Sequence, residues 1–274
     1  MKHTAAKIAI YIVLIVASVI ALFPFIWTFI AATHNNAQIF NMKFTFLPQS
    51  HFGDNLKQLQ TSVPIWKNLG NSIFITVTYT VLIILLDSMA GFGFAKYHFK
   101  GNKTIFFICL ITMMIPPQVT MVPLYIQMNS MHWVNTPWAI IVPGLASMFG
   151  VFLMRQNFEQ FPNDLIESAH IDGAGDLRAF FQIVLPTMKP SLASLGILTF
   201  VQQWGNYMWP LIVLNKQSSY TLPLSLAMLV APGNVINYGS IMVGAVITLL
   251  PVLIFFLIFQ KNFIAGMLSG AVKG

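Results

Sequence analysis

The chain has 274 residues, of which 57% are hydrophobic and only 8% are charged, and its mean hydropathy is +0.74. Soluble domains carry about 25% charged residues, so this composition excludes an ordinary soluble protein and predicts a single membrane domain over residues 1–274. The net charge of +7 does not indicate nucleic-acid binding, because the basic residues lie scattered at the ends of apolar segments and form no stripe.

Six apolar segments are long enough to cross a membrane, which takes roughly 20 residues. They cover residues 8–32, 69–95, 104–126, 136–154, 191–214 and 238–259. Lipid offers the backbone no hydrogen-bond partner, so the segments are predicted to be α-helices, and they are too long for the strands of a barrel. The fold class is therefore an all-α polytopic membrane protein with six transmembrane helices.

The first segment begins like a secretory signal peptide, with Lys2 and Lys7 before an apolar stretch. That stretch continues uncharged to Ala32, well beyond the roughly 7 to 15 residues of a signal-peptide core. We therefore predict a retained first helix, followed by an external loop at about residues 33–68.

The second segment carries an acidic residue near the middle of the membrane. Asp87 lies nine residues before Lys96, which is roughly 13 Å along a helix. A central acid costs about 2.5–3.5 kcal/mol on insertion scales. Two interpretations stay open: an acceptor for a substrate hydroxyl or for a group on another chain, or a protonated or hydrogen-bonded residue between helices. Nearby, Gly91 and Ala95 form a pair of small residues that suits close helix packing.

Prolines and tryptophans mark the next two segments. Pro116, Pro117 and Pro123 are predicted to bend the third segment. Trp133 and Trp138 are predicted to mark the outer membrane interface at the start of the fourth. Ten lysines and arginines fall on the side of the membrane that holds both termini and four on the other, which predicts cytoplasmic termini.

Five of the seven acidic residues lie between the fourth and fifth segments. They are Glu159, Asp164, Glu167, Asp172 and Asp176. Within this loop Pro162 can begin a short helix and Gly173 can end it. A second helix would then show an apolar face of Leu177, Phe180, Phe181 and Val184. Periodicity alone favours an amphipathic interfacial loop without a partner, whereas the concentration of carboxylates favours a docking surface for a water-soluble one.

The fifth segment carries a polar run near its middle. Gln203, Asn206 and Tyr207 share one helix face, and Trp204 lies among them. Polar side chains at this depth face a bundle interior or a watery cavity, where amides and phenols can bind sugar hydroxyls and an indole can stack on a sugar ring. The alternative is that they join helices by hydrogen bonds.

The acid-rich loop resembles the EAA loop of ABC importer permeases. The runs that carry the likeness are Glu167–Ala169, Ile171–Ala174, Ile183–Pro186 and Lys189-Pro190. The resemblance extends to Phe94-Ala95-Lys96, to Trp204–Tyr207 and to the tail Gly270–Gly274, which are similar to the maltose-type second permeases of the sugar-importing branch. These motifs cover nearly the whole chain.

This resemblance implies a cytoplasmic coupling loop at about 157–189, whose first helix sits in a cleft of an ATPase, and a cytoplasmic tail at about 260–274. The implied coupling residues are Glu167, Ser168, Ala169, His170, Asp172, Gly173 and Ala174. Two of them depart from the family pattern. Ser168 replaces an alanine, and His170 replaces a lysine or arginine, which leaves a basic contact in doubt because an unperturbed histidine is mostly neutral at pH 7.

The resemblance also implies partners: a second permease, two cytoplasmic ATPase subunits and an extracytoplasmic solute-binding protein, in the cell membrane of a prokaryote. The chain has no phosphate-binding GxxxxGK[ST] loop, so it is expected to be no enzyme and to bind no cofactor, with ATP and Mg²⁺ on the ATPase. Neither a disulfide nor a metal site is expected, since Cys109 is the only cysteine and the histidines are scattered.

The predicted cargo is a neutral sugar or oligosaccharide, because Arg155 and Arg178 are both cytoplasmic and no lysine lies within a segment. The predicted substrate path comprises Asp87, Gln203, Trp204, Asn206 and Tyr207. A glycerol-phosphate or polyol permease of the same family is one alternative. An ion-coupled secondary transporter is another; Asp87 fits it, but the missing internal repeat does not.

Overall fold

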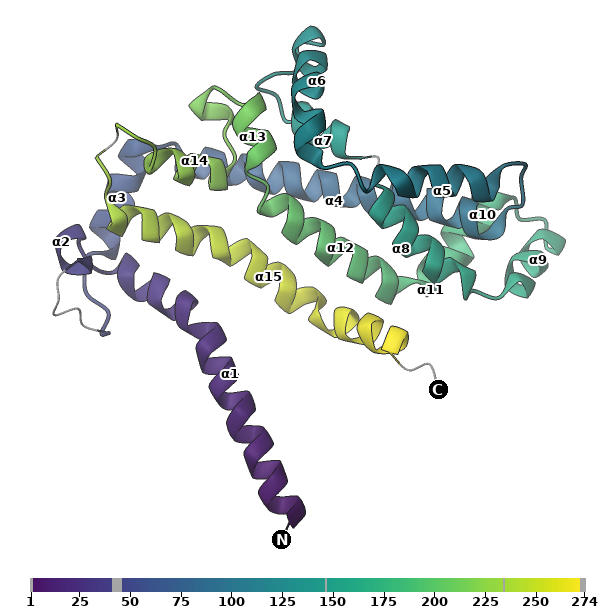
Figure 1. Ribbon diagram of the computed structural model, residues 1–274, viewed down its shortest axis with the longest axis horizontal. Helices are drawn as coiled ribbons and strands as arrows, with labels where there is room; N and C mark the ends of the chain where they lie inside the picture. The colour runs from purple at the N-terminus through teal and green to yellow at the C-terminus, as the bar shows by residue number, and fades with distance from the viewer. Residues whose placement is uncertain (1, 41–45, 146, 234, 272–274) are drawn as a thin grey trace. The chain divides into compact units, whose positions relative to one another are not determined.

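Figure 1 shows the computed structural model of the chain, which describes residues 2–40, 46–145, 147–233 and 235–271. Within these residues all regular secondary structure is helical and no strand is found, as predicted. The elements are α1 (Lys2–Ala32), α2 (Asn36–Ile39), α3 (Phe52–Ser62), α4 (Ile65–Lys96), α5 (Asn102–Thr112), α6 (Pro117–Ser130), α7 (Trp138–Ile141), η1 (Val142–Gly144), α8 (Met148–Glu159), α9 (Asn163–Ile171), α10 (Asp176–Ala179), η2 (Phe180–Val184), α11 (Leu185–Thr187), α12 (Lys189–Trp204), α13 (Met208–Val213), η3 (Gln217–Ser219), α14 (Leu222–Leu229) and α15 (Tyr238–Ala271).

Three helices of the described chain are long and apolar enough to cross a membrane: Lys7–Ala32, Ile65–Lys96 and Tyr238–Lys261. Three pairs of shorter helices pass the same test together, but each pair is bent by more than 40°. The pairs are Asn102–Thr112 with Pro117–Ser130, Trp138–Gly144 with Met148–Glu159, and Asp176–Thr187 with Lys189–Trp204. By length and composition the chain thus has up to six spans, three continuous and three broken.

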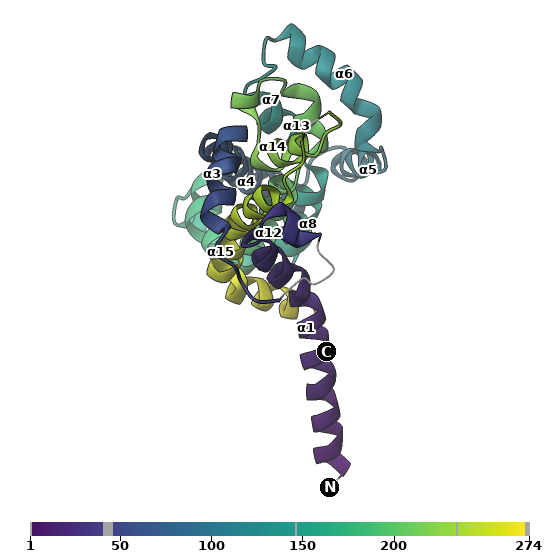
Figure 2. The same cartoon turned by 90° about the vertical axis from the view of Figure 1, so that its left-hand side faces the viewer.

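The break in the third span follows from its prolines. α5 ends at Thr112 and α6 begins at Pro117, and the two helices meet at 94° (Figure 2). Proline has no backbone N–H, and it restricts the residue before it to extended conformations, so Pro116 and Pro117 cannot continue α5. The predicted bend is confirmed there, whereas Pro123 lies inside α6.

The fifth apolar segment has a further interruption after Trp204, which the sequence analysis did not predict. α12 ends at Trp204, and α13 begins only at Met208. In a continuous helix the ring of Pro210 would clash with the carbonyl of Asn206, and Gly205 is a weak helix former. The prediction of one helix over residues 191–214 was therefore wrong.

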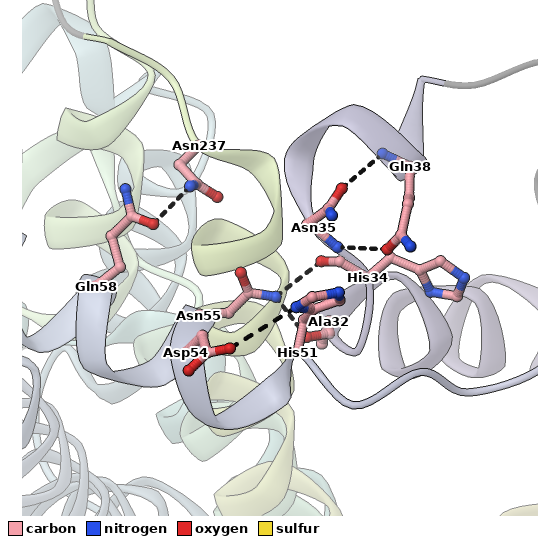
Figure 3. Close-up of polar contacts among 9 residues, drawn as sticks. All are labelled: Ala32, His34, Asn35, Gln38, His51, Asp54, Asn55, Gln58 and Asn237. Carbon is pink, nitrogen blue, oxygen red and sulfur yellow. Dashed lines mark hydrogen bonds and ion pairs between the residues drawn. The ribbon is translucent and has the colours of Figure 1, made fainter.

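The structure divides into two compact units. The first comprises residues 1–66 and 225–251. Here the predicted external loop contains α2 and α3, and Figure 3 shows how its polar side chains hold it together. Asn55 donates from Nδ2 to the carbonyls of Ala32 (2.9 Å) and His34 (2.8 Å), which α1 leaves unpaired at its end. Asn237 donates to Gln58 at 2.7 Å, which ties the segment before α15 to α3.

The second unit comprises residues 67–224 and 252–274. Its core contains buried side chains of α4, α8, α12 and the loop between the fourth and fifth spans. They are Ile83, Phe92, Met154, Phe158, Phe161, Ile166, Phe180, Val184 and Leu195. α4 approaches the backbone of α8 at Gly91, where an added Cβ would lie 2.8 Å from the backbone nitrogen of Arg155. The close packing predicted for Gly91 is confirmed.

The predicted tail at residues 260–274 continues α15 to Ala271. The rest of the family-like tail sequence, residues 272–274, lies outside the described residues.

Candidate functional site

The predicted coupling loop, at about residues 157–189, contains α9, which runs from Asn163 to Ile171 directly after Pro162. Asp164 lies in its first turn, where the helix dipole stabilises a carboxylate by about 0.3–1 kcal/mol. Ile166 and Ala169 are buried, so α9 packs one face on the core and exposes the other. The short helix predicted between Pro162 and Gly173 is confirmed.

Gly173 ends α9 in a left-handed conformation, with φ at +81°. The N–H of Ala174 bonds to the carbonyl of Ala169 at 2.9 Å, and the N–H of Gly173 bonds to that of His170 at 3.0 Å. This pair of bonds is a Schellman motif, which a glycine favours because other residues are strained at positive φ. The motif fixes the turn that follows α9.

The second helix of the loop differs from the prediction. It is a composite of α10, a π-helical turn (η2) and α11, rather than one regular α-helix. Phe180 and Val184 are buried as expected, but Leu177 is 65% exposed and Phe181 is 43% exposed. The expected four-residue apolar face was therefore half wrong, because the wider π turn changes the angular spacing of the side chains.

An aromatic cluster anchors the loop to the spans. The ring of Phe180 lies 5.1 Å from that of Phe92 on α4 and 6.2 Å from that of Phe158 on α8, and those two rings are 5.5 Å apart. The start of the loop is held separately, because Lys96 donates to the carbonyl of Phe161 at 2.6 Å and to Asn163 at 2.8 Å. The loop is thereby attached to α4 and α8 at both of its ends.

The two halves of the loop are also joined to each other by a contact between a histidine and a carboxylate. Nε2 of His170 lies 3.1 Å from Oδ1 of Asp176, so α9 contacts the start of α10. Asp176 also faces Tyr97 at the end of α4. Burial and this carboxylate raise the pKa of Tyr97 to about 12, so the phenol is protonated at physiological pH. His170 thus makes a polar contact within this chain.

The predicted coupling residues lie together on the outer side of α9 and its cap. Glu167, Ser168, His170, Asp172 and Gly173 are exposed, Ala174 is half-buried and Ala169 is buried. Among them Ile171 is 85% exposed, a high value for an isoleucine in a polar loop. The sequence analysis did not single out Ile171, although an apolar residue among carboxylates was a signal that could have done so.

A second feature is a cavity of about 180 Å³ among the broken spans. It is lined by Tyr79, Pro117, Thr120, Met121, Leu124, Ile140, Pro143, Gly144, Gln203, Asn206 and Trp209. Gln203 and Asn206, both predicted path residues, therefore face one space. The sequence analysis missed Tyr79, Thr120 and Trp209, because only the three breaks bring these spans together.

The other predicted path residues lie elsewhere. Trp204 is buried and stacks on Phe200 with ring centroids 5.9 Å apart. Tyr207 is half-buried at the start of α13 and does not line the cavity. Asp87 is only 2% exposed, lies against Gly150 of α8 and does not line the cavity.

A family model described as "Binding-protein-dependent transport system inner membrane component" matches residues 88–269, which include the coupling loop and most of the cavity. The chain belongs to this family. Its relatives are transport permeases. The arabinooligosaccharides transport system permease protein of Halalkalibacterium halodurans is 38% identical over 93% of this chain and 92% of its own length. The lactose transport system permease protein of Rhizobium radiobacter is 35% identical over 100% and 98%.

A more distant relative widens the range of cargo in the permease family. The sn-glycerol-3-phosphate transport system permease protein of Escherichia coli is 28% identical over 93% of this chain and 94% of its own. The fold is shared with a solved bacterial ABC transporter involved in the import of the acidic polysaccharide alginate, with a TM-score of 0.82. That likeness covers 96% of this permease and 98% of the other chain at 24% identity.

Proposed function

We propose that this permease is one subunit of an ATP-driven ABC importer that carries a neutral sugar or oligosaccharide. The observation that supports this most is the construction of the coupling loop. Its outer side is polar and exposed, and it includes the exposed side chain of Ile171. Its inner side is fixed to α4 and α8 through Phe180 and Lys96. Such a loop can bind a soluble ATPase and transmit the movement of the ATPase to the spans.

The coupling step follows from this construction. In the proposal, α9 inserts into a cleft of a cytoplasmic ATPase, with Glu167 and Ile171 in contact with it and Gly173 holding the turn. ATP and Mg²⁺ bind to the ATPase, and this chain contributes no catalytic residue and binds no cofactor. Two ATPase subunits, a second permease and an extracytoplasmic binding protein complete the complex in the membrane, with both termini of this chain in the cytoplasm.

The cavity supports a neutral cargo. Its polar groups are amides, hydroxyls and an indole, and no lysine or arginine occurs among the described residues that line it. Phosphate recognition uses arginine forks or lysine charges, so the glycerol-phosphate alternative lacks its ligand on this chain. Ligand sites usually hold roughly 300–1,000 Å³, so this smaller cavity forms one wall of a path that the second permease completes.

An ion-coupled secondary transporter is a weaker candidate. It would need an acidic residue within the path, and Asp87 does not line the cavity.

The coupling proposal is tested with the whole complex in proteoliposomes that contain ATP. Glu167→Ala is expected to lower sugar uptake and ATPase retention by at least about tenfold, the factor that 1.4 kcal/mol of binding represents. Asp164→Ala is the matched control, because Asp164 is an exposed acid on the same helix outside the motif, and it should leave both near wild type. Uptake by the permeases without any ATPase would overturn the proposal.

The cargo is tested by competition. Neutral mono- and oligosaccharides are expected to compete with one another for uptake, and glycerol phosphate is expected not to. Asn206→Ala should raise the KM for the transported sugar and leave ATPase retention unchanged. If only glycerol phosphate competed for uptake, the cargo would be glycerol phosphate and not a neutral sugar.

A further inference from the structure

The fourth span is interrupted between η1, which ends at Gly144, and α8, which begins at Met148. A helix break leaves carbonyls unpaired on one side and N–H groups unpaired on the other. Lipid cannot satisfy these groups, so a break at membrane depth needs partners from neighbouring helices. On the described chain one continuous helix, α4, supplies a hydrogen bond to one side of the break and an acidic side chain that packs against the other.

Tyr79 contacts the part of the span that comes before the break. Its hydroxyl donates to the carbonyl of Gly144 at 2.9 Å. The approach is close, since a Cβ added at Gly144 would lie 2.6 Å from the tyrosine ring. Both residues also line the cavity, so this hydrogen bond helps to set the position of its wall.

Asp87 contacts the part of the span that comes after the break. It is 2% exposed, its Oδ2 has no hydrogen-bond partner in the described chain, and it packs so closely on Gly150 that any side chain there would overlap the carboxylate. Gly150 lies in the first turn of α8. Its backbone N–H donates to the Oγ of Ser147 over a long 3.5 Å, and this is the only side-chain cap of α8 among the described residues. A carboxylate is favoured at this positive end of a helix.

Tyr79 and Asp87 are eight residues apart, which is about 12 Å or two turns along α4. We propose that they are positioning residues that brace the broken fourth span from its two sides, and that the glycines at 144 and 150 are the places where α4 makes this contact. Asp87 thereby shapes the transport path through α8 and does not contact the cargo. This proposal deepens the proposed function, but its structural test does not depend on transport.

The test is hydrogen–deuterium exchange of the backbone from residue 142 to 151 in the assembled complex in nanodiscs. Tyr79→Phe, which removes one hydroxyl, is expected to speed exchange there about fivefold, as the loss of one hydrogen bond of about 1 kcal/mol predicts. Asp87→Asn should have a smaller effect than Asp87→Ala, because the amide keeps the volume of the side chain that packs on Gly150. Gly150→Ala, which displaces the carboxylate, should resemble Asp87→Ala.

Thr80→Val and Ser88→Ala are matched controls, since both are buried polar neighbours on α4 whose hydroxyls have no partner among the described residues. They should leave exchange at 142–151 unchanged. If Asp87→Ala does not assemble, Tyr79→Phe and Asp87→Asn still decide the question. Unchanged exchange in these two variants would overturn the brace, and a changed KM for sugar with unchanged exchange would instead make Asp87 a cargo contact. Loss of ATP dependence with faster exchange would reject the transport proposal alone.

Discussion

At the scale of single residues, the coupling loop depends on the backbone conformation of one glycine. Gly173 adopts φ +81°, and the two capping bonds at the end of α9 require this conformation. Gly175, two residues later, has an ordinary φ of −74°. Neither glycine has another heavy atom near its added Cβ, so the two positions differ only in backbone conformation.

Gly173→Ala is therefore expected to destabilise the cap by about 1 kcal/mol or more, because an L-residue is strained in the left-handed region. The loosened turn should lower ATP-driven uptake and retention of the ATPase. Gly175→Ala, measured in the same assays, should behave like the natural chain. Equal losses in both variants would show that the conformation of residue 173 is not what matters.

At the scale of elements, the aromatic cluster connects the loop to two spans. Phe180 is 2% exposed and touches the rings of Phe92 and Phe158, whereas its neighbour Phe181 is largely outside and touches mainly Phe180. This packing gives a movement of α9 a route to α4 and α8. The two adjacent phenylalanines thus have different expected roles.

Phe180→Ala is expected to cost about 3–5 kcal/mol of local packing, the usual range for a buried phenylalanine. ATP hydrolysis by the assembled complex should continue while sugar uptake falls, so the number of ATP molecules used per sugar rises. Phe181→Ala is the control and should keep that ratio. Uptake and hydrolysis that fall in proportion in Phe180→Ala would argue against a transmitting role.

At the scale of the whole molecule, orientation is still a prediction from charge. The basic residues favour a cytoplasmic position for the loop after α4 and an external position for the region of α3. In a Cys109→Ser background, Lys57→Cys should react with a membrane-impermeant maleimide on intact cells, and Lys100→Cys should react only after permeabilisation. Both side chains are exposed, so access is set by the membrane. Reversed labelling would place the coupling loop outside and end the proposed mechanism.

The sequence predicted helical spans, of which the structure has up to six by length and composition, because apolar length is read directly from the residues. It located α9 because Pro162 and Gly173 bound it. The break at Gly205–Tyr207 was missed, because the polar run was assigned to an intact helix although Gly205 and Pro210 were signals against one. The sequence also could not separate Asp87 from Gln203 and Asn206. All three are polar and near mid-membrane, and only the structure shows that Asp87 packs on α8 and does not line the cavity.

The contact between Asp87 and Gly150 also limits how the chain can change over generations. Any side chain at position 150 would occupy the volume of the carboxylate, so an alanine there requires a smaller residue at position 87. The two sites, 63 positions apart in the printed sequence, therefore form one mutational unit. A change at either site is therefore expected to alter what the other can tolerate.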